Sequence, residues 1–286
     1  MKLPNFHTHT EYCDGKGSVE DYIKQALDLK QPAIGFTGHA PVPFDSEWNM
    51  TEENFKKYLA DITHAKEKYK SEIEVYIGLE VDYIRSVQKP SDFKKYNLNY
   101  IIGSVHYLYP STAEKPYDFV ISPAVFKETL RKVYGGNIKK MIKDYYSQVN
   151  AMIESGDFEI IGHLDQMSKF NKGDAFFDDL DVSYQNTVIE TLELIAQNGL
   201  ILEINTRGKL KKQLENFFPS TKIINESKKR GIPFMLNADA HKPEELNSLM
   251  SEAAQYLYDL GVKELVVIEK GEFVSKGITS FIKGKQ

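Results

Sequence analysis

The sequence contains very little cysteine, and it has neither a long apolar run nor a basic block. Cys13 is the single cysteine among 286 residues, so no disulfide can form within the chain, which is typical of a reducing compartment. No stretch approaches the roughly 18 consecutive apolar residues of a membrane-spanning helix. The N-terminal residues show no signal-peptide pattern. We therefore expect a cytoplasmic protein without a membrane partner.

The charge balance argues against nucleic acid as a partner. The formal net charge is -5, and the basic residues are spread along the chain, whereas nucleic-acid-binding proteins usually carry basic patches. A small anionic substrate remains compatible with this charge, because bound cations can reverse the local sign. Hydrophobic residues make up 41% of the chain, which is enough for a sizeable core. The sequence does not indicate an oligomeric state.

Short apolar runs alternate with amphipathic segments along the whole chain. The expected strands lie at about 3–9, 33–39, 75–80, 100–106, 159–163, 200–206, 232–241 and 265–268, and the expected helices at about 18–30, 51–69, 124–134, 137–154, 182–198, 219–230 and 243–260. Residues 108–122 are expected to form a loop. This alternation predicts βαβ units and a parallel sheet covered on both faces. With no linker visible, we expect residues 1–286 to form one domain.

Histidines and carboxylates stand where the expected strands end. Six of the seven histidines occupy such positions, and the seventh, His64, falls on the polar side of a helix, where we expect an exposed residue without a role. His7 and His9 are two apart in a strand, so they point to one face, and Asp239 and His241 repeat that spacing. The candidate ligands are His7, His9, Asp14, His39, Glu80, His106, His163, Asp239 and His241.

This placement favours a closed or distorted barrel over an open doubly wound sheet. A barrel brings the carboxyl ends of all its strands to one rim, whereas an open sheet spreads them along an edge. Mixed imidazole and carboxylate ligands suit zinc, iron or manganese. Nine ligands exceed the needs of one ion but suffice for two or three divalent ions if Glu80, the one glutamate in the set, bridges. A coordination position left open for water would make such a site catalytic.

The ordered set resembles the PHP (polymerase and histidinol phosphatase) superfamily, in its histidinol-phosphate phosphatase branch. The motifs that carry the resemblance are His7-Thr8-His9-Thr10, Cys13-Asp14-Gly15, Phe36-Thr37-Gly38-His39, Gly78-Leu79-Glu80, Gly103-Ser104-Val105-His106, Gly162-His163-Leu164-Asp165, Glu203-Ile204-Asn205-Thr206 and Asn237-Ala238-Asp239-Ala240-His241. They extend from residue 7 to residue 241. A lone HxH would be weak, because amidohydrolases share it, but the full order is specific.

The resemblance implies a distorted (β/α)7 TIM-like barrel with a trinuclear metal centre. By position, one ion would be held by His7, His9, Glu80 and Asp239, the second by Glu80, His106 and His163, and the third by Asp14, His39 and His241. Glu11 lies close to Asp14 in the sequence and is an alternative ligand. The segment after residue 260 departs from a seven-stranded barrel and is expected to form an edge strand or a cap.

The implied reaction is hydrolysis of L-histidinol phosphate to L-histidinol and phosphate in histidine biosynthesis. We hypothesise that a hydroxide bridging two ions attacks phosphorus. Arg207, after the sixth strand, either grips phosphate oxygens or is a loop arginine in solvent. Lys169 is a second candidate, although this branch often carries an arginine where the chain has Ser168-Lys169. Asp165 would either protonate the leaving alkoxide or orient His163.

Other functions use similar residues. A nucleotide phosphodiesterase or a phosphotyrosine phosphatase of the same superfamily would hold the same metals and differ in its substrate loops. A metal-dependent amidohydrolase would usually place a bridging lysine at a strand end, and no expected strand ends that way. A non-catalytic module with a vestigial site should have lost ligands, yet every expected position is filled. The leading prediction is therefore an enzyme, a metal-dependent histidinol-phosphatase.

Overall fold

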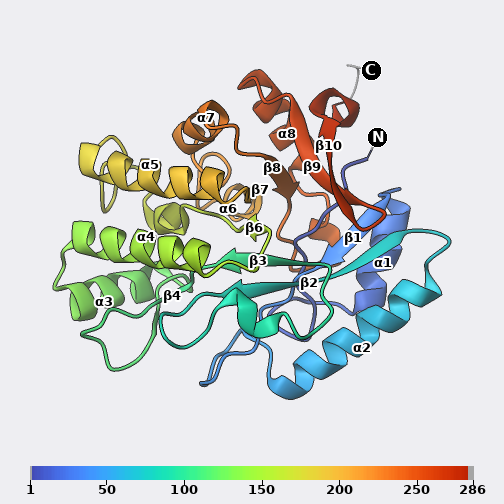
Figure 1. Ribbon diagram of the computed structural model, residues 1–286, viewed down its shortest axis with the longest axis horizontal. Coiled ribbons are helices and arrows are strands. Elements are labelled where there is room, and N and C mark those ends of the chain that lie inside the picture. The colour runs from blue at the N-terminus through green and yellow to red at the C-terminus, as the bar shows by residue number, and fades with distance from the viewer. Residues whose placement is uncertain (1, 283–286) are drawn as a thin grey trace.

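A six-stranded parallel sheet forms the centre of the computed structural model, which describes residues 2–282 (Figure 1). Its strands are β1 (Ala33–Phe36), β2 (Glu74–Asp82), β3 (Tyr100–Ser104), β6 (Ile160–Ile161), β7 (Ile201–Asn205) and β8 (Phe234–Asn237), hydrogen-bonded in that order. All five pairings are parallel. The order follows the chain without reversal, unlike the doubly wound alternative, whose strand order reverses at a switch point.

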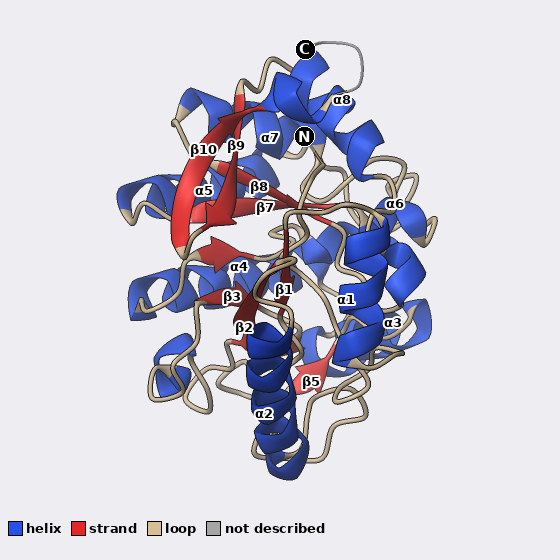
Figure 2. Ribbon diagram, turned by 90° about the vertical axis from the view of Figure 1, so that its right-hand side faces the viewer, coloured by secondary structure: helices blue, strands red, loops and turns tan. Residues whose placement is uncertain are grey.

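Helices connect successive strands and lie around the sheet, which curls between them (Figure 2). They are α1 (Val19–Asp28), α2 (Glu52–Lys68), α3 (Pro123–Tyr134), α4 (Ile138–Ser155), α5 (Val182–Gln197), α6 (Arg207–Leu210), α7 (Thr221–Lys229) and α8 (Met250–Asp259), with 3₁₀ turns η1 (Pro90–Phe93), η2 (Gln166–Phe170), η3 (Pro243–Glu245) and η4 (Ile278–Phe281). None of the described helices has the length and apolar character needed to cross a membrane.

Local sequence explains where helix α1 begins. Ser18 accepts a hydrogen bond from the Asp21 backbone N–H, and the Asp21 carboxylate accepts one from the Ser18 N–H, which completes a capping box. The buried side chains of Val19, Ile23 and Ala26 then recur at helical spacing and face the core. This helix corresponds to the one expected from the sequence at about 18–30.

The first expected strand is an extended segment, residues 5–9, that lies between the two edges of the sheet. Asn5 forms a parallel bridge with Ile34 of β1, and Thr8 forms one with Ala240 just after β8. Backbone hydrogen bonds from His9 N–H to Ala240 O, 2.8 Å, and from Ala240 N–H to His7 O, 3.0 Å, reinforce the second contact. This segment therefore joins the first and last strands of the curled sheet.

Gly35 and Gly78 leave room for the Tyr100 side chain, which contacts the extended segment 5–9. The Tyr100 hydroxyl donates a hydrogen bond to Phe6 O, 2.7 Å away. A Cβ on Gly35 would lie 2.1 Å from that hydroxyl, and one on Gly78 would lie 2.7 Å from the Tyr100 ring. Side chains at those two positions would displace the tyrosine, so glycine is needed there for close approach.

Three expectations about the connections need correction. The expected loop at 108–122 contains part of a two-stranded ribbon, β4 (Tyr107–Leu108) with β5 (Tyr117–Asp118). The expected helix at 243–260 is divided into η3 and α8, because Leu249 has a positive φ of 60° that interrupts the helix. The expected last strand is one arm of a hairpin, β9 (Glu264–Glu269) with β10 (Glu272–Gly277).

Candidate metal centre

The nine candidate ligands converge at the carboxyl ends of the strands. Glu80 belongs to β2, and the extended segment 5–9 carries His7 and His9. The other ligands follow strand ends, except Asp14, which comes from the turn after the extended segment. Ligand atoms of three clusters lie within 4.8 Å of one another: His9, Asp14, His39 and His241; His7, His9 and Asp239; Glu80, His106 and His163. These clusters include every ligand predicted from the sequence.

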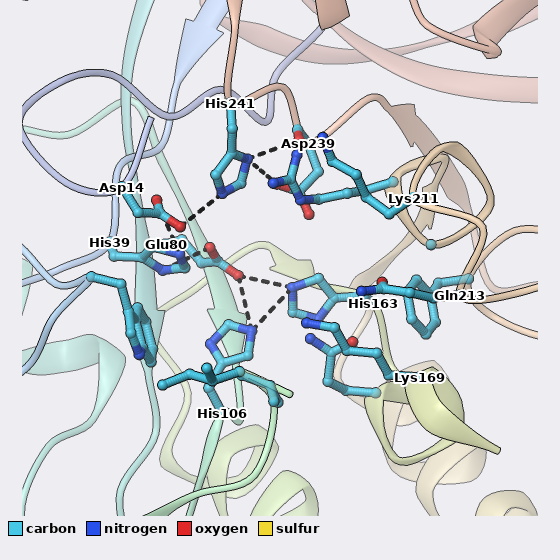
Figure 3. A pocket seen from close by; sticks show the side chains of 17 residues that line it. Asp14, His39, Glu80, His106, His163, Lys169, Lys211, Gln213, Asp239 and His241 are labelled. Carbon is cyan, nitrogen blue, oxygen red and sulfur yellow. Dashed lines mark hydrogen bonds and ion pairs between the residues drawn. The ribbon is translucent and has the colours of Figure 1, made fainter. Parts of the chain in front are cut away.

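Glu80 lies between the clusters, and its two oxygens face different histidines (Figure 3). Its side chain is 1% exposed. Oε1 lies 3.0 Å from His163 Nε2 and 3.8 Å from His106 Nε2, whereas Oε2 lies 3.0 Å from His39 Nδ1, 3.3 Å from His7 Nε2 and 3.4 Å from His9 Nε2. Its placement matches the bridging position that the sequence suggested.

Asp14 is the most accessible member of the set. Its Oδ2 lies 3.0 Å from His241 Nε2, and its Oδ1 lies 3.5 Å from His9 Nδ1. The pKa of its carboxyl is lowered far below the usual range, because the charges of His241 and His39 outweigh the effect of burial. Glu11, the alternative considered from the sequence, is exposed and belongs to none of the clusters among the described residues.

Two further carboxylates, which the sequence analysis did not predict, contact the Nδ1 atoms of His7 and His106. Glu203 Oε1 lies 2.6 Å from His7 Nδ1, and Asp82 Oδ1 lies 2.9 Å from His106 Nδ1. A carboxylate on one ring nitrogen fixes the tautomer and leaves the other nitrogen free for a ligand role. Asp82 stands two residues after Glu80 in the same strand, and this i, i+2 spacing was a signal for it.

Several buried polar atoms in the clusters have no hydrogen-bond partner. They are His7 Nε2, His9 Nε2, His39 Nδ1, Glu80 Oε2 and Asp239 Oδ1. An unpartnered buried polar group costs roughly 1–3 kcal/mol, so five at one place indicate a missing partner. Burial, together with His241 and His39, lowers the pKa of His9 to about 3, whereas neighbouring carboxylates raise the pKa of His7, His39 and His163 against the effect of burial. A metal would take the place of the protons that those carboxylates attract, because a neutral imidazole is the form that binds a metal. The donor set therefore fits divalent cations.

A cavity of about 360 Å³ opens over these clusters, and three cationic side chains line it. Lys169 belongs to η2, Arg207 begins α6, and Lys211 follows α6. Figure 3 shows Lys169 and Lys211 on the side of His163 and Asp239, across from Asp14 and His39. Burial lowers the pKa of Lys169. The candidate metal ligands therefore form the floor of the cavity, and Lys169, Arg207 and Lys211 form its basic wall.

Glu245 holds two of these cations. Its Oε2 lies 3.1 Å from Arg207 Nη1, and its Oε1 lies 2.6 Å from Lys211 Nζ. Arg207 Nη1 also donates to the carbonyl oxygen of Asp239, 3.1 Å away. Arg207 is therefore anchored at the cavity wall and is not a free loop arginine. Lys211 was not predicted, because the sequence showed it only as part of a basic loop.

Asp165 lies beside the clusters but does not line the cavity. It is 1% exposed, and its Oδ2 accepts a hydrogen bond from the Ser220 N–H, 2.9 Å away. Burial raises the pKa of its carboxyl to about 7. Its cavity-facing neighbours are His163 and Gln166. Among the described residues, its carboxylate bonds the Ser220 N–H and not His163, so both predicted roles, protonating the leaving alkoxide and orienting His163, stay predictions.

Comparison with known proteins identifies related chains over nearly the whole length. A family model described as the PHP domain matches residues 5–207. A Deinococcus radiodurans protein named probable histidinol-phosphatase is 32% identical over 264 residues, which cover 91% of this chain and 94% of the relative.

Two crystal structures share the fold. A Listeria monocytogenes protein named putative histidinol phosphatase superposes with a TM-score of 0.77, at 22% identity, over 86% of this chain and 97% of the other. The histidinol phosphate phosphatase of Lactococcus lactis, solved with zinc, L-histidinol and phosphate, superposes with a TM-score of 0.67, at 18% identity, over 96% of this chain and 99% of the other.

Proposed function

The chain belongs to the PHP domain family, and on that premise we propose that it is a metal-dependent histidinol-phosphatase. It would hydrolyse L-histidinol phosphate to L-histidinol and phosphate in histidine biosynthesis. The observation that carries this proposal is that nine imidazole and carboxylate ligands come together in adjoining clusters, and seven of them line one cavity with a basic wall. The name of the Deinococcus radiodurans relative and the ligands bound to the Lactococcus lactis enzyme support the choice of substrate.

Two to three divalent ions, of zinc, iron or manganese, are proposed as cofactors. His7, His9, Glu80 and Asp239 would hold one ion, Glu80, His106 and His163 a second, and Asp14, His39 and His241 a third. Divalent ions held there would supply positive charge for the phosphoryl oxygens and would lower the pKa of a water molecule, the source of the hydroxide hypothesised from the sequence.

The chain's own residues would bind and orient the phosphoester. Arg207 presents a guanidinium fixed by Glu245, and such a fork can grip two phosphate oxygens. Lys169 adds a second positive charge from η2, although it lacks the fork geometry. Asp165, held by the Ser220 N–H, would orient the segment that carries His163.

The extended segment at residues 5–9 would close the barrel by taking the place of the seventh strand in a distorted (β/α)7 barrel. The bridges from Asn5 to β1 and from Thr8 to Ala240 support this proposal. Residues 1–286 would then unfold as one domain. A single cooperative unfolding transition, coincident by far-UV and near-UV circular dichroism, is expected, and two separated transitions would contradict it. A cytoplasmic location remains a prediction from the lone cysteine.

The test is phosphate release from L-histidinol phosphate by purified protein, with bound metal measured on the same sample. Nucleotide diesters and a phosphotyrosine peptide are assayed in parallel. We expect turnover to prefer histidinol phosphate, to disappear with a chelator and to return with zinc or manganese. A preference for another phosphoester would retain the chemistry and reject the substrate. Absence of both metal and hydrolysis after metal addition would reject the proposed function altogether.

A further inference from the structure

Trp48 is held against the β4–β5 ribbon by two different contacts. Tyr107 and Asp118 are paired across that ribbon. The indole ring of Trp48 stacks on Tyr107, with centroids 5.1 Å apart and an interplanar angle of 12°. Its Nε1–H donates a hydrogen bond to Asp118 Oδ2, 2.9 Å away. One ring face and the polar edge of this tryptophan are therefore both fixed by neighbouring positions of one ribbon.

Asp118 also shapes the turn that follows it. Its Oδ1 accepts hydrogen bonds from the N–H groups of Val120, 2.7 Å, and Ile121, 3.2 Å. Trp48, Val120 and Ile121 all line the cavity above the metal-ligand clusters. A single carboxylate thus sets the position of three cavity-lining side chains. Ile121 is 52% exposed and lines this cavity.

The cavity is divided by chemistry. Its three lysine and arginine residues come from segments after β6 and β7, whereas Trp48, Val120 and Ile121 come from segments before β6. Phe218 is the apolar exception on the basic side. The rings of His39 and His106 lie edge-on to Trp48, with centroids 4.4 and 5.3 Å away. The apolar wall, formed by Trp48, Val120 and Ile121, therefore adjoins the ligand clusters at His39 and His106.

We propose that Trp48 binds the organic group of the substrate and that Asp118 is the positioning residue that holds Trp48 and the 120–121 turn in place. This proposal rests on the proposed function. With the phosphoryl group on the basic side, the alcohol part of the ester points toward the apolar wall. An imidazole ring and an ammonium group, both present in histidinol, each interact favourably with an indole face.

Because Trp48 is the only tryptophan in the chain, the tryptophan fluorescence of the protein reports on this part of the cavity alone. Metal-loaded protein is titrated with L-histidinol, and separately with inorganic phosphate, while tryptophan emission is recorded. We expect a saturable emission change with L-histidinol and at most a small change with phosphate. Competitive inhibition by L-histidinol without any change in emission would overturn the proposal, because the organic group would then bind away from Trp48.

Asp118→Asn tests the positioning role, because an amide has one acceptor where the carboxylate has two. Either the indole N–H or the two backbone N–H groups lose their acceptor. We expect KM for histidinol phosphate to rise about five- to tenfold, with an altered emission maximum and an unchanged inhibition constant for inorganic phosphate. An unchanged KM and emission spectrum would overturn the role of Asp118.

Asp181→Asn is the matched control. Asp181 Oδ1 likewise accepts from the backbone N–H groups two and three residues on, Ser183 and Tyr184, and its Oδ2 binds Lys139. It lies outside the cavity lining, so its loss should leave KM and emission unchanged. An equal effect in this control would show that Asp118→Asn acts through general destabilisation, which would also overturn the proposal.

Trp48→Phe and Trp48→Ala separate the ring from its hydrogen bond. Phenylalanine keeps an aromatic face but lacks the N–H donor, whereas alanine removes both. We expect KM for histidinol phosphate to rise more in Trp48→Ala than in Trp48→Phe, while inhibition by phosphate stays the same. An unchanged KM in Trp48→Ala would overturn the proposal. If the protein without substitutions fails to hydrolyse histidinol phosphate, the proposed function is rejected. The titration with L-histidinol then still tests whether Trp48 binds this organic group.

Discussion

Glu203 Oε1 lies 2.6 Å from His7 Nδ1, and neither side chain is exposed to solvent. Glu203 Oε2 accepts hydrogen bonds from the His163 N–H, 3.0 Å, and from Asn205 Nδ2, 3.0 Å. One buried glutamate thus fixes a histidine of one cluster and the backbone of a histidine of another. Although Glu203 is in neither cluster, it sets the distance between them.

Glu203→Gln should weaken metal binding. The neutral amide cannot stabilise a positively polarised His7 ring as the carboxylate does, and loss of such a partner typically costs 10- to 100-fold in metal affinity. Competition with a chromophoric chelator measures this affinity. Glu226→Gln, on the outer helix α7, is the control. An unaltered metal affinity in Glu203→Gln would show that metal binding does not depend on a carboxylate at Nδ1 of His7.

Glu80→Ala and His241→Ala should differ in the number of ions lost. Glu80 faces histidines of all three clusters, whereas His241 contacts Asp14 and Asp239 at the rim. We expect Glu80→Ala to lose about two ions and to reduce kcat at least about a thousandfold, and His241→Ala to lose about one. Metal analysis by mass spectrometry decides between them. Equal losses would contradict the bridging position of Glu80.

Arg207→Ala should weaken phosphate binding. Losing a charge-assisted hydrogen bond costs about 1.5–3 kcal/mol, which corresponds to a fall of roughly tenfold or more in kcat/KM and a similar rise in the inhibition constant of inorganic phosphate. Arg230→Ala removes an arginine that pairs with Glu226 on α7 and is the control. An unchanged inhibition constant for phosphate would show that Arg207 does not bind phosphate and serves only as a structural partner of Glu245.

Glu159→Gln should change the pH dependence of stability. Burial raises the pKa of Glu159, although its carboxylate accepts a hydrogen bond from the Ile101 N–H, 2.8 Å away. The folded state therefore holds this proton more tightly than the unfolded state, so the contribution of Glu159 to stability falls as pH rises from its unfolded pKa through its folded pKa. Glutamine keeps an acceptor and carries no charge.

The difference in unfolding free energy between the two proteins, measured in denaturant at several pH values, isolates this residue. Above its folded pKa, the variant should be more stable than the parent, and partial exposure of the carboxyl limits the size of this difference. Below the unfolded pKa the advantage should vanish. A constant difference across the range would contradict the effect of burial.

The sequence predicted which side chains come together, because their positions follow from strand periodicity and parallel pairing. Carboxyl ends of parallel strands meet at one edge, so His39, His106 and His163 were expected to lie together before any coordinates. His64 lies exposed on α2, as its position on the helix predicted. Local pattern is sufficient where chain order and spatial order coincide, and here the sheet order follows the chain.

The supporting residues were harder to predict because they depend on tertiary packing. Glu203 lies within an apolar run, and the sequence alone does not show which buried atom it faces. The β4–β5 ribbon has two residues in each strand, too few for a periodic signal. Its role depends on Trp48, which comes from a separate loop some sixty residues earlier. Such contacts are fixed only when distant segments pack together.

The seam between residues 5–9 and Ala240 has a consequence for how the protein is made. During synthesis, His7 and His9 emerge more than 200 residues before their partners Asp239 and His241. Chains are made at about 5–20 residues per second, so these histidines wait roughly ten seconds or longer. The nascent chain therefore cannot bring these four side chains together until residues 239–241 have been made.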